Sequence, residues 1–500
     1  MPHYLSDDEM ARTVPAEQAA FRSPVPTQIV SNGEFNPLPQ TREQQRVEAR
    51  IKEMSDHLRR RHGLSRRQFL ASSAGMAAAF LAMNEVFGAI FDVSPAEAQQ
   101  PGVAAERARG LAGQFIVDVQ THFVRDDFNQ EGLLGLAKYA KQHWHPALAG
   151  ENNLARFKFE NYVQEIFVDS DTKVALLSGA PFDDTNWDFL SNDHINAART
   201  GINRIAGSRR LLSHAVFTPK KRGWMDQVDH AIARLKPDSW KGYTIGDPLF
   251  PSKAGSYWRL DDEKLMYPFY EKIAKSGINT VCIHKGLLPL DYEKSWPGVW
   301  EYATPWDVGK VAKDWPQLNF VMYHGALRAL LEPPDAAMAE FEQTGRIKWA
   351  TDLAEIPGKY GVTNVYSDVG TAFANSAVAN PRFAAAFIGT LVRGLGADHV
   401  LWGSDSVWYG SPQWQIEAMR RLEIPEDMRR KHGFAPLGAA DGVVKSAIFS
   451  GNAARLYNIH QRAALGALSG DQIAAIKGEY IATGGTRSNA RYGFVHRERA

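Results

Sequence analysis

From residue 115 onward, short runs of β-branched and other apolar residues alternate with longer stretches whose apolar residues recur at helical spacing. Short apolar runs that end in a polar residue are typical of buried strands, and the stretches between them are typical of amphipathic helices. Strands are predicted at 115–120, 173–177, 211–217, 243–245, 280–283, 319–323, 365–367 and 399–402. Eight strands alternating with helices favour closure into a (β/α)8 TIM-like barrel, predicted over residues 113–460.

Helices are predicted between the strands and after the last of them. They fall at 192–206, 224–235, 262–276, 335–345, 381–395, 412–422 and 442–457. No Gly-x-Gly-x-x-Gly motif follows the first strand, which weighs against a dinucleotide-binding fold. The aromatic, irregular stretches 182–187 and 250–260 are expected to be loops at the mouth of the barrel.

The two ends of the chain differ from the barrel in composition. Residues 1–42 are rich in Pro, Asn, Gln and Ser, which is typical of disorder. Residues 41–61 are charged at helical spacing and predict a solvent-exposed helix. We therefore expect residues 1–64 to form a disordered and charged extension, and residues 461–500 to form a C-terminal tail.

A segment between the extension and the barrel resembles a twin-arginine signal peptide. Residues 65–70 (SRRQFL) are followed by an apolar run and then by Ala96-Glu97-Ala98, which has the small-x-small pattern of a cleavage site. The resemblance implies a signal over residues 65–98, export by the twin-arginine translocase and a periplasmic protein. The run is too short and too weakly apolar for a spanning helix. Because the Arg pair lies unusually deep in the chain, a downstream start and an uncleaved, membrane-anchored extension are the alternatives.

Composition narrows the class of protein only slightly. The chain has 500 residues, 44% of them hydrophobic and 23% charged, which is ordinary for a globular protein. Its 57 basic and 56 acidic residues give a net charge of +1, so no overall field attracts nucleic acid or an acidic membrane. The single cysteine, Cys282, excludes an intrachain disulfide and a cysteine-based zinc site, and its apolar neighbours predict a buried strand residue.

Four chemically active side chains follow predicted strands. His122, His284, His324 and Asp405 stand after strands one, five, six and eight. The carboxyl ends of barrel strands converge on one mouth, where active sites of this fold are built. Imidazole and carboxylate are suitable ligands for Zn, Mn or Fe. The pattern therefore predicts a metal-dependent active site at the barrel mouth.

The motifs around these residues resemble the amidohydrolase superfamily, in particular its aminocarboxymuconate-semialdehyde decarboxylase branch. The resemblance covers residues 113–460 and rests on 116–122 (IVDVQTH), 322–325 (MYHG), 401–405 (LWGSD) and 451–457 (GNAARLY). The last motif marks the closing helix, where Asn452 is expected to hydrogen-bond the backbone. The resemblance implies a small-molecule substrate and a homodimer.

The resemblance also implies roles for individual residues. His122 and His284 would ligate one divalent ion, with Zn expected first and Mn or Fe as alternatives. Asp405 would ligate the ion or hold a water and take its proton, while His324 would orient that water or act as general acid or base. Such an ion lowers the pKa of its water to about 7. Arg328, just past His324, is the candidate partner for a substrate carboxylate.

One residue departs from the family pattern. The first strand usually carries two histidines, and Gln120 stands at the position of the first. Side chains two apart on a strand face the same way, so Gln120 still faces the expected metal position. The site then holds a metal more weakly or prefers Mn or Mg, recruits His143, His145 or Asp118, or has lost the metal.

Two further strand-end residues and three functions remain open. Lys285 and Asp368 either line the pocket or pair with each other. The leading function is a metal-dependent hydrolase acting on a small cyclic or aromatic acid. The alternatives are a non-oxidative metal-dependent decarboxylase on the same scaffold and a metal-free, non-catalytic binding barrel.

Overall fold

The computed structural model describes most of the chain. The described residues are 13–15, 23–30, 38–125, 158–180, 190–246, 256–288, 292–295, 297–328, 334–485 and 494–496. The short strands β1 (Thr13–Pro15) and β10 (Phe494–His496) pair antiparallel, although they are far apart in the sequence. Every other described strand belongs to one eight-stranded sheet.

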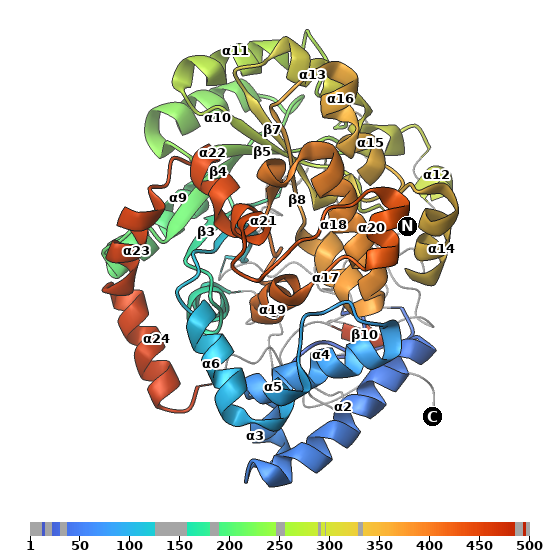
Figure 1. Cartoon of the computed structure of the whole chain (residues 1–500). Coiled ribbons are helices and arrows are strands. Elements are labelled where there is room, and N and C mark those ends of the chain that lie inside the picture. Colours follow the sequence, from blue (N-terminus) through green and yellow to red (C-terminus); the bar gives the residue numbers. More distant parts are fainter. Residues whose placement is uncertain are drawn as a thin grey trace.

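That sheet is a parallel barrel in chain order (Figure 1). Its strands are β2 (Val117–Thr121), β3 (Val174–Leu177), β4 (Leu211–Val216), β5 (Ser239–Tyr243), β6 (Thr280–His284), β7 (Asn319–Tyr323), β8 (Val365–Asp368) and β9 (Val400–Leu401). The backbone N–H of Val119 donates to the Trp402 carbonyl at 3.0 Å, and Asp405 donates to Gln120 at 2.9 Å. These bonds join the last strand to the first, so the predicted (β/α)8 barrel is confirmed.

Helices surround the barrel (Figure 1). Between the strands lie α8 (Phe159–Val163), η4 (Gln164–Val168), α9 (Asn192–Ala206), α10 (Trp224–His230), η6 (Ala231–Leu235), α11 (Tyr267–Ser276), α12 (Tyr292–Ser295), η7 (Trp300–Ala303), η8 (Pro305–Asp307), α13 (Val308–Asp314), η9 (His324–Ala326), α14 (Pro334–Thr344), α15 (Ala350–Ala354), α16 (Ile356–Tyr360), α17 (Gly370–Ala379), α18 (Pro381–Leu395) and η10 (Ala397–His399). After the last strand come α19 (Gln413–Arg421), α20 (Glu426–His432), α21 (Val443–Ser446), η11 (Ala447–Gly451), α22 (Asn452–Leu456), α23 (Gln461–Ser469) and α24 (Gln472–Ala482).

Alternation along the strands separates two apolar layers. On β6, Val281 and Ile283 pack outward with residues of the surrounding helices, whereas Cys282 points into the barrel. This is the period-two pattern of a pleated strand. The prediction of Cys282 as a buried strand residue is confirmed.

The fourth strand is displaced from its prediction. It was expected at 243–245, and β5 instead covers Ser239–Tyr243. The sequence hides this strand because Lys241 and Gly242 interrupt its apolar pattern. Lys241 is nevertheless fully buried, and an added Cβ on Gly242 would lie 2.6 Å from Phe217.

The closing helix is fixed as the sequence predicted. The side-chain amide of Asn452 donates to the carbonyls of Ala397 and Val400 at 2.8 and 2.7 Å. These bonds attach the start of α22 to the last barrel strand and complete the ring.

A helical layer lies beside the barrel, formed by the chain that precedes β2 (Figure 1). We call residues 42–111 the N-terminal layer; it contains α2 (Arg42–Arg61), α3 (Arg66–Leu70), α4 (Ser73–Phe87), α5 (Pro95–Gln99) and α6 (Pro101–Leu111). The helix expected over 41–61 is present, but one face of it is buried against α4 rather than solvated. Among the described residues, no helix is both long and apolar enough to cross a bilayer.

A buried ion pair joins α19 to the chain around it. Arg420 donates to Asp171 at 2.8 Å, to the Leu111 carbonyl at 3.0 Å and to Gln114 at 2.9 Å. The side chains of Arg420 and Asp171 are each only 1% exposed. Since a buried charge is costly unless it is paired and hydrogen-bonded, this guanidinium ties three distant segments together.

Candidate active site

The four residues predicted at the strand ends come together at one mouth of the barrel. His122 follows β2, His284 ends β6, His324 follows β7 and Asp405 follows β9. The His284 and His324 rings lie 4.8 Å apart between centroids, and His122 contacts Asp405 directly. The barrel thus places side chains that are far apart in sequence in one cluster.

The pair His122–Asp405 is the centre of this cluster. The Nδ1 of His122 lies 3.0 Å from the Ser178 carbonyl, which can only accept a hydrogen bond, so Nδ1 carries the proton. In a neutral ring, Nε2 is then a lone pair, and it faces Asp405 Oδ1 at 3.0 Å. Two acceptors at this distance require a shared positive charge, either a second proton on the ring or a cation. The ring is held by stacking on Trp408 at 5.5 Å.

Asp405 is held from several sides in an ionised form. Its Oδ2 accepts a hydrogen bond from the Thr371 hydroxyl at the start of α17. Burial alone would raise the pKa of Asp405, but its contact with His122 and the hydrogen bond from Thr371 hold it well below its usual range. Its backbone has φ +61°, a conformation that non-glycine residues adopt rarely and chiefly at functional sites.

His324 has the same uncommon backbone and a neutral ring. Its φ is +60°, and its backbone N–H donates to Asp368 Oδ1 at 2.5 Å. Burial lowers the pKa of its imidazole to about 3. The ring is therefore neutral at physiological pH and is suited to orienting a water by hydrogen bonding rather than to acting as a general acid.

Gln120 points into the cluster, as its alternation with His122 predicts. Its Nε2 lies 3.2 Å from His324 Nε2. Its Oε1 and His324 Nδ1 are buried without a hydrogen-bond partner among the described residues. An added Cβ on Gly370 would lie 2.6 Å from that oxygen and 2.7 Å from His324 Nδ1, so only glycine leaves room for both groups there.

His284 completes the set with a second neutral imidazole. Its ring stacks on Tyr243 at 4.9 Å. Burial and the field of Lys241 lower its pKa well below the ordinary value. A neutral imidazole is the form that binds a metal.

The donor set suits a divalent cation in its chemistry. Neutral imidazoles, an ionised carboxylate and an orphaned amide oxygen are all ligands for such ions. In the described part of the chain, however, no three His, Cys, Asp or Glu side chains enclose a common metal position. The side chains instead contact each other in pairs, with His122 on Asp405 and Gln120 on His324.

Lys241 is a buried charge near the site that the sequence prediction missed. Its Nζ lies 3.3 Å from the centre of the Tyr323 ring and has no hydrogen-bond acceptor among the described residues. Burial lowers its pKa to about 8, although Cys282, Asp368 and Asp405 oppose that shift. The ammonium thus partly offsets the carboxylates beside the mouth.

We expect this lysine to give the protein a distinctive pH dependence. The pKa of Lys241 is about 8 in the folded state and 10.5 in the unfolded chain. Below pH 8 the buried charge lowers the free energy of unfolding, and this loss disappears as the pH rises from 8 to 10.5, because the folded state then releases the proton first. The advantage of Lys241→Met over wild type should therefore shrink by about 3 kcal/mol across that interval. Urea unfolding at several pH values measures it, with the exposed Lys264→Met as control. A pH-independent difference would contradict the expectation.

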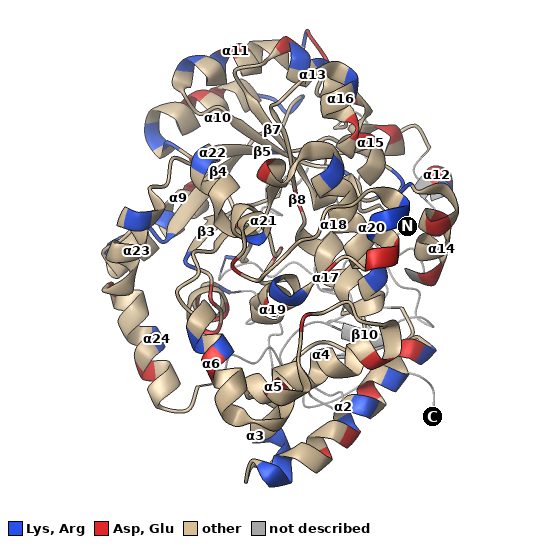
Figure 2. Ribbon diagram, in the orientation of Figure 1, with Lys and Arg blue, Asp and Glu red and all other residues tan. Residues whose placement is uncertain are grey.

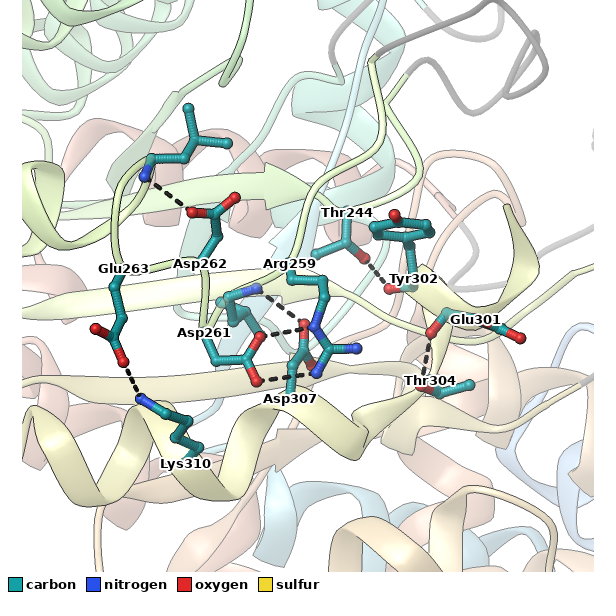
Figure 3. Close-up of polar contacts among 12 residues, drawn as sticks. Thr244, Arg259, Asp261, Asp262, Glu263, Glu301, Tyr302, Thr304, Asp307 and Lys310 are labelled. Atoms are coloured by element: carbon teal, nitrogen blue, oxygen red, sulfur yellow. Dashed lines mark hydrogen bonds and ion pairs between the residues drawn. The ribbon is translucent and has the colours of Figure 1, made fainter. Parts of the chain in front are cut away.

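Other predicted residues lie elsewhere or have other partners. Arg328 pairs with Glu293 at 3.1 Å. Lys285 and Asp368 do not pair with each other, because Lys285 binds Asp307 at 2.9 Å. Asp307 also accepts from the Leu260 amide beside the Arg259–Asp261 pair (Figure 3).

Asp118 has a structural position beneath the site. Its Oδ1 accepts from the backbone N–H of Gln120 and of Ser404, which joins β2 to the end of the last strand. Burial raises its pKa to about 7. His143, His145, the stretch 182–187 and most of 250–260 lie outside the described residues.

Comparison with solved structures gives only distant similarity. An uncharacterized TIM-barrel protein from Bordetella bronchiseptica shares 14% identity at a TM-score of 0.42, over 70% of this chain and 99% of its own. 5-Carboxyvanillate decarboxylase from Sphingomonas paucimobilis shares 14% identity at a TM-score of 0.40, over 69% of this chain and 99% of its own. 2,6-Dihydroxybenzoate decarboxylase from Rhizobium shares 11% identity at a TM-score of 0.38, over 69% of this chain and 99% of its own. No curated protein matches.

The closed parallel barrel with a histidine and carboxylate cluster at its mouth defines the class, a (β/α)8-barrel enzyme. Residues 209–459 match the model of the amidohydrolase family, which is half of the chain. The chain belongs to the amidohydrolase family. His284, His324 and Asp405 lie within the matched residues, whereas Gln120 and His122 precede them. The predicted superfamily is confirmed, as is the prediction of an enzyme, a hydrolase or carboxy-lyase of this kind.

Proposed function

We propose that the protein is a metal-dependent hydrolase of small cyclic or aromatic acids. The observation that carries the proposal is the pair His122–Asp405, in which a ring nitrogen and a carboxylate oxygen face each other at 3.0 Å. The ring nitrogen on the other side is committed to Ser178. A divalent cation is the group that such a pair accommodates best when the imidazole is neutral.

His122, His284 and Asp405 would hold the ion, with Gln120 beside them as a weaker oxygen ligand. When bound, a divalent ion would lower the pKa of a water and polarise a substrate oxygen. Asp405, ionised and fixed by Thr371, accepts the proton that the attacking water loses and passes it to the leaving group. His324, neutral and fixed through Asp368, orients that water. Arg328 is the proposed partner of the substrate carboxylate.

The second candidate is non-oxidative decarboxylation in the same pocket. The observation that favours it is Asp368, because burial raises the pKa of this carboxyl well above its ordinary value. The raised pKa favours the protonated form of Asp368, and a protonated carboxyl beside His324 would be the proton donor in this reaction. In this reaction the bond to the substrate carboxylate breaks, CO2 leaves, and the proton goes to the ring carbon.

Metal content is the first test of the proposal. We expect about one Zn, Mn or Fe per chain in protein purified without chelator, as three or four protein ligands bind such an ion tightly. Elemental mass spectrometry measures it. His284→Ala should lose the metal, whereas the matched control His399→Ala, which changes a histidine bonded to Asp398 and Thr363 away from the mouth, should keep it.

The opposite outcome has an equally definite meaning. If no metal binds even after loading with Zn and Mn, the metal-dependent mechanism fails for both reactions, and the metal-free alternative is favoured. A preference for Mn over Zn would reflect Gln120, whose amide oxygen is a harder ligand than imidazole.

The reaction itself is tested by its products. Aromatic and cyclic carboxylic acids are incubated with the metal-loaded protein, and the products are identified by mass spectrometry. Addition of water to the substrate supports hydrolysis, and release of CO2 supports decarboxylation.

Location and assembly remain proposals. From the signal-like motif at 65–70 we propose export by the twin-arginine translocase. Cell fractionation tests this location. A homodimer is proposed from the family resemblance, which light scattering on the purified protein checks.

A further inference from the structure

We infer that the N-terminal layer, including the segment that resembles a signal peptide, is a permanent part of the working protein and is not removed after Ala98. The inference is independent of the reaction proposed above. It rests on the burial of the layer, on its bonds to the barrel and on its contact with α17.

The apolar run expected to be the core of a signal is a buried helix. Ala77, Ala78, Ala79, Phe80 and Ala82 of α4 have no exposed surface. They belong to the same apolar cluster as residues of α17, α18 and α19. In Figure 2 the charges lie along α2, and α4 is almost free of them. The helix is placed as a core helix, and removing it would expose the apolar face on which it packs.

Polar bonds join residues 90–97 of the layer to the end of α19. The backbone N–H of Asp92 donates to the Arg421 carbonyl at 2.6 Å, and Glu423 donates to Ile90 at 2.7 Å. The buried Arg421 guanidinium donates to Glu97 at 2.8 Å. Backbone pairing of this kind is made between parts of one fold, since unpaired buried groups are costly.

The proposed cleavage site is itself folded. Ala98 lies in α5 and is 1% exposed, and the neighbouring Glu97 is committed to Arg421. Proteolytic cleavage favours exposed, extended loops, because the protease must bind the backbone on both sides of the bond. The folded chain therefore protects the bond after Ala98.

The layer also reaches the site through α17. The side-chain amide of Gln44 in α2 donates to the carbonyl of Val378, near the end of α17. Thr371 at the start of the same helix donates to Asp405. Every residue of α17 is buried. Through α2 the layer thus contacts the helix that fixes the carboxylate of the candidate active site.

The first test cuts the folded full-length chain. A recognition sequence for a specific protease is inserted between Gln100 and Pro101, both of which are exposed. After cleavage we expect the two fragments to co-elute in size-exclusion chromatography and to separate only in denaturant. Spontaneous separation that leaves a barrel with an unchanged melting temperature would overturn the inference.

The second test compares two aspartates on α4 in protein made in the cytoplasm. Ala78→Asp places a carboxylate in the buried face and should abolish the soluble folded protein. The matched control Ser73→Asp lies at the exposed helix start and should unfold at the wild-type temperature. An Ala78→Asp protein that unfolds at the wild-type temperature would contradict the inference.

The third test reads the chain itself. Intact mass of the active protein isolated from its native cell should include residues 42–111. A protein that begins at Gln99 would overturn the inference. These tests read chain length and folding, so they succeed or fail independently of the proposed reaction.

Discussion

Replacing Asp405 by Asn is expected to lower kcat/KM about a thousandfold while the protein stays folded, since general-base groups contribute on the order of 10²–10⁴ to rate. The amide oxygen of the new side chain still accepts from Thr371, and its NH2 donates to the lone pair of His122. The hydrogen bonds that position the residue survive, but the negative charge and the proton acceptor are lost.

The measurement is kcat/KM on the acid that product analysis identifies, together with the melting temperature. The matched control is Asp398→Asn, which changes an exposed aspartate of η10 bonded to His399. It should keep full activity. If Asp405→Asn retains wild-type turnover, proton transfer through this carboxylate is excluded.

Replacing Arg420 by Met is expected to have the largest effect on stability, a loss of about 3–5 kcal/mol in the free energy of unfolding. The substitution removes the shortest ion pair of Asp171, whose side chain is 1% exposed, and leaves that buried carboxylate with the more distant Lys477 ammonium at 3.8 Å. It also removes the donor to the Leu111 carbonyl, which joins the N-terminal layer to the barrel.

Arg430→Met is the control for this substitution. Arg430 pairs with Glu426 on α20 at 3.4 Å, but its side chain is 74% exposed. Surface pairs of this type contribute about 0–1 kcal/mol. Urea unfolding of both variants provides the comparison, and equal losses would contradict the role given to the buried pair.

The barrel could be predicted because most of its strands are continuous apolar runs that a parallel sheet buries on both faces. The run from Thr280 to His284 is such a case. The strand from Ser239 to Tyr243 is not, because Lys241 reads as a surface residue in sequence. Its burial is decided by Tyr323 and by carboxylates from other strands, which no local pattern shows.

The same distinction applies to the site. His122, His284, His324 and Asp405 were predictable because the ends of barrel strands share one mouth. Ser178, Thr371 and Trp408 were not, because each comes from a segment whose contact with the site exists only after the barrel closes. The partners of Arg328 and Lys285 come from the chain between β6 and β7 and left no signal in the sequence.

Because Cys282 lies in the interior of the barrel, the reactivity of its thiol reports on unfolding. It is the only sulfhydryl in the sequence, and it lies inside the barrel beside Tyr457. Burial raises the pKa of the thiol to about 11, so the reactive thiolate is scarce as well as enclosed. A thiol reagent can modify the native protein only when the strands part. The rate of thiol modification therefore measures how often the barrel opens. No label has to be introduced, and no second cysteine competes for the reagent.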